Sequence, residues 1–213
     1  GNNVEAIIEG FDRSKMFLVM FFAVSWLQLP ARESPSLSHA REIITSQPQG
    51  RRFIFIVLGV HGLGSVLNLF GLSLIASIID KSRDFVLKRR FTTALMLGFT
   101  SASCWSPFYI SVAVVLIAIP SLKLFDVALF GIIISSSIMC VGFAYDFLKF
   151  KKNDSFKLKP PKSFNIKKFI RLILILMILI LLVASLHYFG DLAIPIALGI
   201  VTPVFSIVWW IML

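Results

Sequence analysis

Long apolar runs constrain this chain more than any other feature. Phe53–Ile79, Phe91–Ile119, Leu124–Leu148, Phe169–Tyr188 and Leu192–Leu213 each reach the roughly 20 residues that an α-helix needs to cross the hydrocarbon of a bilayer. The runs are continuously apolar instead of alternating, which excludes a transmembrane β-barrel. The sequence therefore predicts an all-α fold, a polytopic transmembrane helix bundle. We expect a multi-pass protein of the cell (inner) membrane.

The number and the placement of charged residues also indicate a membrane protein. Only 15% of the 213 residues are charged and 57% are hydrophobic, whereas soluble domains carry about 25% charged residues. The net charge of +10 does not indicate a nucleic-acid partner, because the Lys and Arg residues stand beside the ends of the apolar runs. Counting the short run Met16–Leu29 as a further span places 16 of the 21 Lys and Arg residues on the cytoplasmic side. This predicts six spans with both termini inside, and the lipid bilayer as partner.

The polar stretches divide the chain. We expect residues 1–148 to form a first helix bundle, 149–168 a basic cytoplasmic linker, and 169–213 the start of a second bundle. Ser36–Thr45 has apolar residues at helical spacing and predicts a short interfacial helix. The chain does not begin with Met and ends within an apolar run, so we expect further helices on each side.

The stretch Thr100–Phe108 interrupts the apolar run Phe91–Ile119. Pro107 has no amide hydrogen, and Ser106 before it is a favourable N-cap. This predicts two half-helices, the second beginning at Pro107 with unpaired N–H groups inside the membrane. Many secondary transporters build their substrate site from such interruptions. The alternative is an ordinary proline kink in a spanning helix.

A second polar group lies deep in the run Phe53–Ile79. His61, Ser65 and Asn68 are spaced i, i+4, i+7 and so share one helix face. Polar side chains at this depth are costly unless they have a partner or face a cavity. The alternative is that they join neighbouring helices by hydrogen bonds. We predict a substrate site made of both groups, namely His61, Ser65, Asn68, Thr100, Ser103 and Ser106, with Ser106 and the following helix N-terminus facing the solute.

The composition of this predicted site limits its chemistry. No Asp, Glu, Lys or Arg lies in the core of any predicted span, and Cys104 and Cys140 form no metal-ligand spacing. No catalytic motif is present, so we expect neither an enzyme nor a cofactor nor a bound metal. Hydroxyls, an amide and helix N-termini suit a small anionic or polar solute. Coupling to Na⁺ or H⁺ and assembly as a homodimer are left open.

Three short segments resemble the ion transporter superfamily, which includes arsenite-efflux, citrate and dicarboxylate carriers and the large membrane subunit of TRAP transporters. They are Leu37-Ser-His-Ala-Arg-Glu-Ile-Ile44, Gly50-Arg-Arg-Phe53 and Gly64-Ser-Val-Leu-Asn68, followed by the Gly/Ser-rich stretch Gly98–Pro107. The resemblance covers roughly Leu37–Leu148. It implies two inverted repeats of discontinuous helices, separated by the basic linker, and a carrier that works by alternating access.

The chain departs from this pattern at one point, since Asn68 is followed by neither Thr nor Pro. The resemblance therefore leaves the substrate and the coupling ion unassigned. Two other functions compete with transport. One is a structural or assembly membrane protein without a site of its own. The other is a membrane-embedded enzyme, which would need His61 within hydrogen-bond reach of Ser106.

Overall fold

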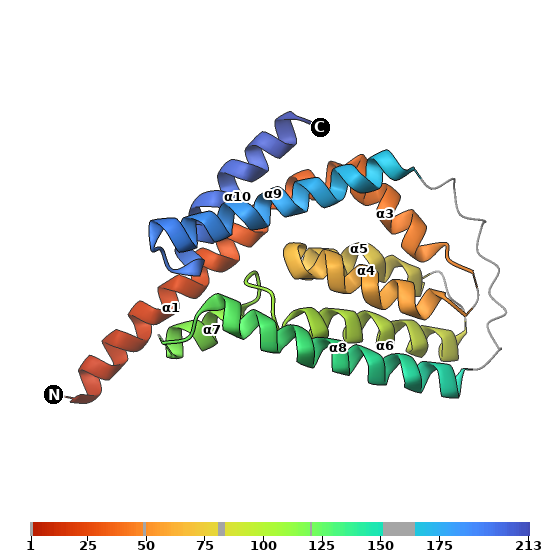
Figure 1. Ribbon diagram of the computed structural model, residues 1–213, viewed down its shortest axis with the longest axis horizontal. Helices are drawn as coiled ribbons and strands as arrows, with labels where there is room; N and C mark the ends of the chain where they lie inside the picture. The colour runs from red at the N-terminus through yellow and green to blue at the C-terminus, as the bar shows by residue number, and fades with distance from the viewer. Residues whose placement is uncertain (1, 49, 81–83, 120, 151–164) are drawn as a thin grey trace. The chain divides into compact units, whose positions relative to one another are not determined.

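The computed structural model describes residues 2–48, 50–80, 84–119, 121–150 and 165–213. Every element of secondary structure within these ranges is an α-helix (Figure 1), so the all-α prediction is confirmed. The helices are α1 (Asn2–Trp26), α2 (Gln28–Glu33), α3 (Pro35–Thr45), α4 (Arg52–Leu67), α5 (Leu69–Asp80), α6 (Phe85–Ala102), α7 (Ile110–Ala118), α8 (Leu124–Lys149), α9 (Ile166–Gly190) and α10 (Ile194–Ile211).

Four stretches of helix are long and apolar enough to cross a membrane: Ser14–Glu33, Leu124–Lys149, Ile166–Gly190 and Ile194–Ile211. They support the prediction of a membrane protein. The first is longer than the predicted run Met16–Leu29, because α2 carries the chain past Pro30. Proline is tolerated in the first turn of a helix, where its missing N–H would have no intrahelical partner.

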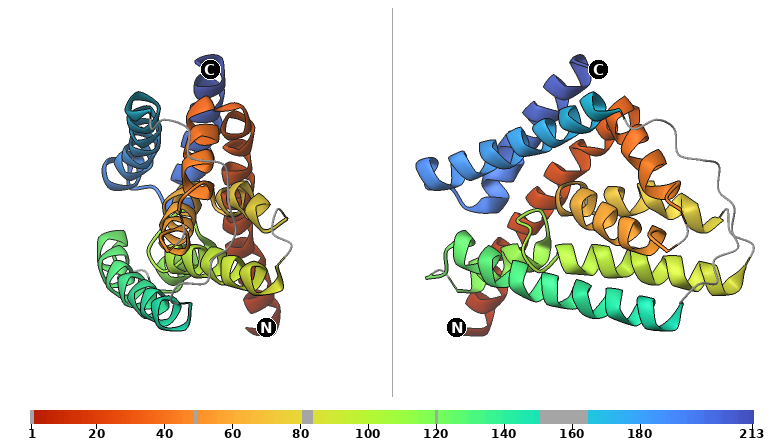
Figure 2. Two further views of the ribbon diagram at one scale, coloured as in Figure 1. Left: turned by 90° about the vertical axis from the view of Figure 1, so that its right-hand side faces the viewer. Right: turned by 45° about the vertical axis from the view of Figure 1, so that its right-hand side comes forward.

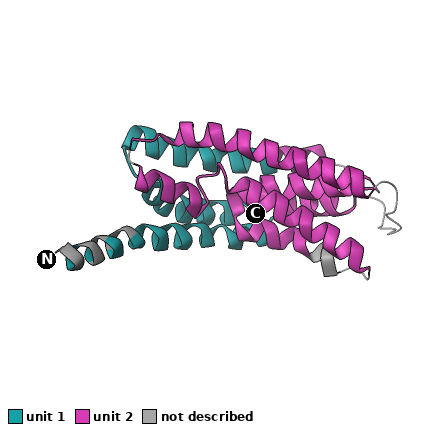
Figure 3. Ribbon diagram, turned by 90° about the horizontal axis from the view of Figure 1, so that it is seen from below, with its two compact units in different colours: residues 1–34, 172–213 teal, residues 35–171 magenta. Residues whose placement is uncertain are grey.

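The helices form two compact units (Figure 3). One contains Gly1–Ser34 and Leu172–Leu213, and the other contains Pro35–Arg171. This grouping differs from the predicted one, in which residues 1–148 belong to a single bundle. Most of the predicted linker, 149–168, lies outside the described residues.

The first unit is built on the contact between α1 and α10. Met20 and Ala23 of α1 are fully buried, as are Ala197 and Leu198 of α10. The helices approach closely at Gly199, where an added Cβ would lie 2.6 Å from a methyl group of Val19. Small residues at such contacts are typical of helix pairs in membranes, because dispersion contacts replace the hydrophobic effect there.

The second unit contains a helical hairpin that the sequence did not predict. The run Phe53–Ile79 was expected to be one span, and that prediction is wrong: α4 ends at Leu67, and α5 lies beside it (Figure 1 and Figure 2). Asn68 reverses the chain with φ 52° and ψ −130°. A Cβ added to Gly71 would lie 2.7 Å from the amide nitrogen of Gly64, which only a folded-back chain allows.

The lengths of the two arms fit a hairpin. The 16 residues of α4 extend about 24 Å and the 12 residues of α5 about 18 Å, both short of the roughly 30 Å hydrocarbon core. The predicted helix at Ser36–Thr45 is present as α3 and buries Leu37, Ala40 and Ile44 in contact with α4 and α5. The hairpin is therefore covered by helix from its own unit.

Helix α6 packs along α4 and forms the centre of the second unit. Its buried residues Phe91, Ala94 and Leu95 meet the buried face of α4. At Gly98 the two backbones come so close that an added Cβ would collide with the carbonyl oxygen of Val57. Glycine is therefore required here by the distance between the helices, and α8 packs on α6 in turn.

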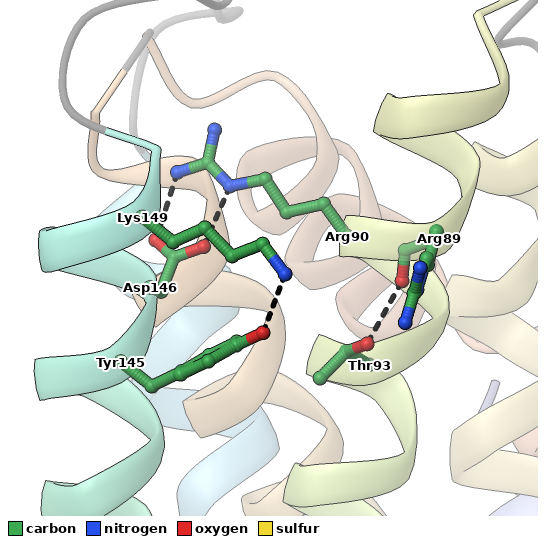
Figure 4. Close-up of polar contacts among 6 residues, drawn as sticks. All are labelled: Arg89, Arg90, Thr93, Tyr145, Asp146 and Lys149. Carbon is green, nitrogen blue, oxygen red and sulfur yellow. Dashed lines mark hydrogen bonds and ion pairs between the residues drawn. The ribbon is translucent and has the colours of Figure 1, made fainter.

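A buried ion pair joins α6 to α8 (Figure 4). The guanidinium of Arg90 donates to both carboxylate oxygens of Asp146 at 2.7 and 2.8 Å, and the two side chains are 4% and 8% exposed. The same guanidinium lies over the rings of Phe53 and Phe150. Phe53 and Arg90 stand at the starts of α4 and α6, and Asp146 stands at the end of α8, so these three helix ends lie together.

This arrangement brings the start of α4 and the start of α6 to one end of the unit. The six-span layout placed Arg51 and Arg52 outside and Lys88 to Arg90 inside. In the structure Arg52 lies over the ring of Phe91, beside Arg90, at one end of the unit. The reason for this closeness is the hairpin, because the chain reverses at Asn68. The six-span layout stays a prediction.

We predict that Arg90→Met lowers the free energy of unfolding by roughly 3–5 kcal/mol, because it leaves the Asp146 carboxylate buried without its counter-ion. The double variant Arg90→Met/Asp146→Leu should recover most of the loss. Denaturant unfolding in detergent micelles measures both. Arg89→Met is the matched control and should change stability by less than about 0.5 kcal/mol, because Arg89 is exposed. Equal losses at the two arginines would contradict the assignment.

Candidate functional site

The tip of the hairpin, residues 64–68, is the first part of the site. The backbone N–H of Asn68 donates to the carbonyl of Gly64 at 2.8 Å and so forms the last turn of α4. The side chain of Asn68 points out of the hairpin and donates from Nδ2 to the carbonyl of Phe108 at 3.0 Å. Ser65 is buried, and its hydroxyl donates to the carbonyl of Gly62 within α4. The hairpin tip is therefore joined to the segment before α7.

That connecting segment, residues 103–109, is the second part. The prediction that helix resumes at Pro107 with Ser106 as N-cap is wrong, because α7 begins at Ile110 and no side chain caps it. The backbone N–H of Ser106 donates to the carbonyl of Ala102 at 3.2 Å, so residue 106 still bonds back toward α6 and does not start a new helix. The hydroxyl of Ser106 accepts from the amide of Phe108 at 3.2 Å, which is a local turn instead of a helix cap.

Ser106 also bonds across to the hairpin. Its hydroxyl donates to the carbonyl of Ser65, which lies in the last turn of α4 and has no partner within that helix. Ser106 is fully buried. Two helix ends are thus satisfied by each other: Asn68 serves a carbonyl of the connecting segment, and Ser106 serves a carbonyl of the hairpin tip.

His61 lies in a second group of hydrogen bonds beside this contact. The indole N–H of Trp105 donates to Nε2 of His61 at 3.2 Å, and Nδ1 of His61 lies 2.9 Å from the hydroxyl of Ser101. Because an indole nitrogen only donates, Nε2 must accept, so the proton of the neutral ring is on Nδ1. The Ser101 hydroxyl then accepts from His61 and donates to the carbonyl of Gly98 at 2.9 Å.

The structure brings together four of the six predicted site residues, namely His61, Ser65, Asn68 and Ser106. The side chains of the other two bond back to α6 instead. Thr100 is exposed and donates to the carbonyl of Met96 in its own helix at 2.8 Å. Ser103 donates to the carbonyl of Thr100 at 2.8 Å. Both hydroxyls bond back to a carbonyl three or four residues earlier, which their positions in the sequence do not reveal.

Tyr109 is the residue that sequence reasoning missed. Its side chain is 5% exposed, yet its hydroxyl has no hydrogen-bond partner among the described residues. It lies 3.2 Å from where a Cβ on Gly64 would be, so it faces the hairpin tip. A buried hydroxyl without a partner is costly and suggests that water or a ligand completes it. An aromatic residue within an apolar run gives no sequence signal of this role.

Comparisons with protein-family models, with curated proteins and with solved structures give no match for this chain. The site is therefore interpreted from its own geometry. Within the described part of the chain, no three His, Cys, Asp or Glu side chains gather as metal ligands. His61 bonds to Ser101 and Trp105, not to Ser106 as the embedded-enzyme alternative requires.

We predict that Ser106→Ala lowers the free energy of unfolding by about 1–3 kcal/mol, because it leaves the carbonyl of Ser65 and the amide of Phe108 buried without their partner. Thr100→Ala removes the same kind of group from an exposed position and should cost less than about 0.5 kcal/mol. Unfolding in detergent micelles compares them. If the two variants were equally stable, the contact between hairpin tip and connecting segment would have no energetic role.

Proposed function

We propose that the protein is a multi-pass carrier of the cell (inner) membrane for a small anionic or polar solute. The hairpin tip and the connecting segment would form its binding site. The observation that carries the proposal is the pair of hydrogen bonds, from Asn68 to Phe108 and from Ser106 to Ser65, that joins two interruptions of helical structure. Within a membrane, irregular backbone is tolerated only when it is buried in protein or lines a cavity.

The groups at this contact match the proposed solute. The hydroxyl of Tyr109 and the amide of Asn68 are neutral hydrogen-bond donors beside Gly64. Helix α7 begins at Ile110 with N–H groups that have no partner within the helix and with the positive end of its dipole. Donors of this kind bind carboxylate or other oxyanion groups in discontinuous transporter helices.

Alternating access would act on the same contact. A solute that takes the donor of Asn68 replaces its bond to Phe108 and separates the tip from the connecting segment. In this scheme Gly64 and Gly71 let the hairpin move as one tightly packed body, and α6 forms the wall against which it moves. The inverted repeat and coupling to Na⁺ or H⁺ belong to this proposal.

One observation favours the alternative, a structural membrane subunit. Ser106 is fully buried, and both of its hydrogen bonds stay within the protein. A packed kink would look the same at this residue. Tyr109 supports the carrier, because a buried hydroxyl without a partner beside the hairpin tip is a group that a solute could bind.

We predict that Tyr109→Phe leaves thermal stability unchanged or raises it, and lowers transport about tenfold or more. Asn68→Gly should act likewise on transport, since glycine accepts the positive φ but lacks the amide. Transport is measured in proteoliposomes with a panel of labelled dicarboxylates, citrate, arsenite, phosphate and sulfate. Thr100→Ala is the control and should retain wild-type rates. Normal transport in both test variants, or no transport of the panel by the wild type, would contradict the proposal.

A further inference from the structure

A groove lies between the first turns of α6 and the last turns of α8, away from the hairpin tip. Its volume is about 230 Å³, and its floor is the ion pair of Arg90 with Asp146. Since these two side chains neutralise each other and are buried, they shape the groove without giving it net charge. The charge of the groove comes from its other lining residues.

Two cations face the groove, one from each helix (Figure 4). Arg89 of α6 is exposed, and no acidic side chain of the described residues pairs with its guanidinium. Lys149 of α8 donates from Nζ to the hydroxyl of Tyr145 at 2.6 Å and lies over the ring of Tyr145. Tyr145 therefore positions the ammonium, while its own hydroxyl hydrogen stays available as a donor. Because the Asp146 carboxylate is paired with Arg90, it does not neutralise the positive charges of Arg89 and Lys149.

The remaining wall of the groove is apolar and open. Phe85 and Val86 line it and are 78% and 54% exposed. A site for a free inorganic anion has no need of large exposed apolar side chains next to its cations. A ligand that has both an anionic group and hydrocarbon satisfies both kinds of lining residue at once.

The position of the groove in the fold fits such a ligand. Helix α8 is a candidate span that ends at Lys149, so its last turn falls where hydrocarbon gives way to headgroups. Basic grooves between membrane helices at this level are suited to anionic headgroups. We propose that this groove binds an anionic phospholipid, with Arg89 and Lys149 on the phosphate oxygens and with Phe85 and Val86 against the acyl chains.

The test is native mass spectrometry of the purified protein with phosphatidylglycerol and with phosphatidylcholine. The wild type should retain phosphatidylglycerol in preference to phosphatidylcholine. Arg89→Gln/Lys149→Gln should weaken phosphatidylglycerol binding about tenfold or more, because it removes both phosphate contacts. Its melting temperature without lipid should equal that of the wild type, since Arg90 and Asp146 are untouched.

The matched control is Lys167→Gln/Lys168→Gln, which removes the same charge from α9, outside the groove. It should weaken phosphatidylglycerol binding less than threefold. Equal weakening in the two double variants would overturn the proposal in favour of diffuse attraction to basic charge. Displacement of the lipid by inorganic phosphate would overturn it in favour of a free-anion site, and equal binding of the two lipids would remove the site altogether.

Discussion

The second unit depends on the satisfaction of backbone groups where helices stop. A membrane offers no water to a free carbonyl or amide, so each interruption of a helix needs a partner within the protein. Two such interruptions face each other in the described part of this unit, one at Asn68 and one over residues 103–109. Each supplies the side chain that the other lacks, through Asn68 to Phe108 and Ser106 to Ser65. The two interruptions are therefore parts of one structural element. Removing either side chain leaves a backbone carbonyl of the other interruption without its partner.

The hairpin also accounts for the charge pattern. Because α4 and α5 return to the same end, basic residues at the start of α4, the start of α6 and the end of α8 gather there. Arg52, Arg90 and Lys149 are held at this end by aromatic rings and, for Arg90, by Asp146. Lys123 precedes α8 at its opposite end. Within this unit these basic residues thus gather mainly at one end.

Much of the fold could be predicted from the sequence, because an apolar run of about 20 residues has few alternatives to a helix. Whether the chain reverses its direction within such a run could not be predicted. Hydropathy reports only that Phe53–Ile79 is apolar, and nothing in it reveals that Asn68 adopts a positive φ. Ser106 and Pro107 did mark an interruption, but the helix start was misplaced by three residues, because the Ser106 hydroxyl bonds to α4 instead of capping α7.

The same limit applies to the candidate site. Helical spacing grouped His61, Ser65 and Asn68, and all three lie on α4 or at its end. The predicted site also included Thr100 and Ser103, although both hydroxyls bond back to carbonyls of α6. Tyr109 has no adjacent polar residue in the sequence that would mark it, and its position beside Gly64 exists only in the folded chain.

The most direct test of this account is the side of the membrane on which the two ends of the hairpin lie. Single cysteines would be placed at Arg51 and at Lys88 in the protein with Cys104 and Cys140 replaced by serine. A membrane-impermeant maleimide would then be applied to right-side-out and to inverted vesicles. A chain that turns back at Asn68 predicts that both positions react from the same side. Reaction from opposite sides would show that Phe53–Ile79 crosses the membrane once, and would contradict the hairpin.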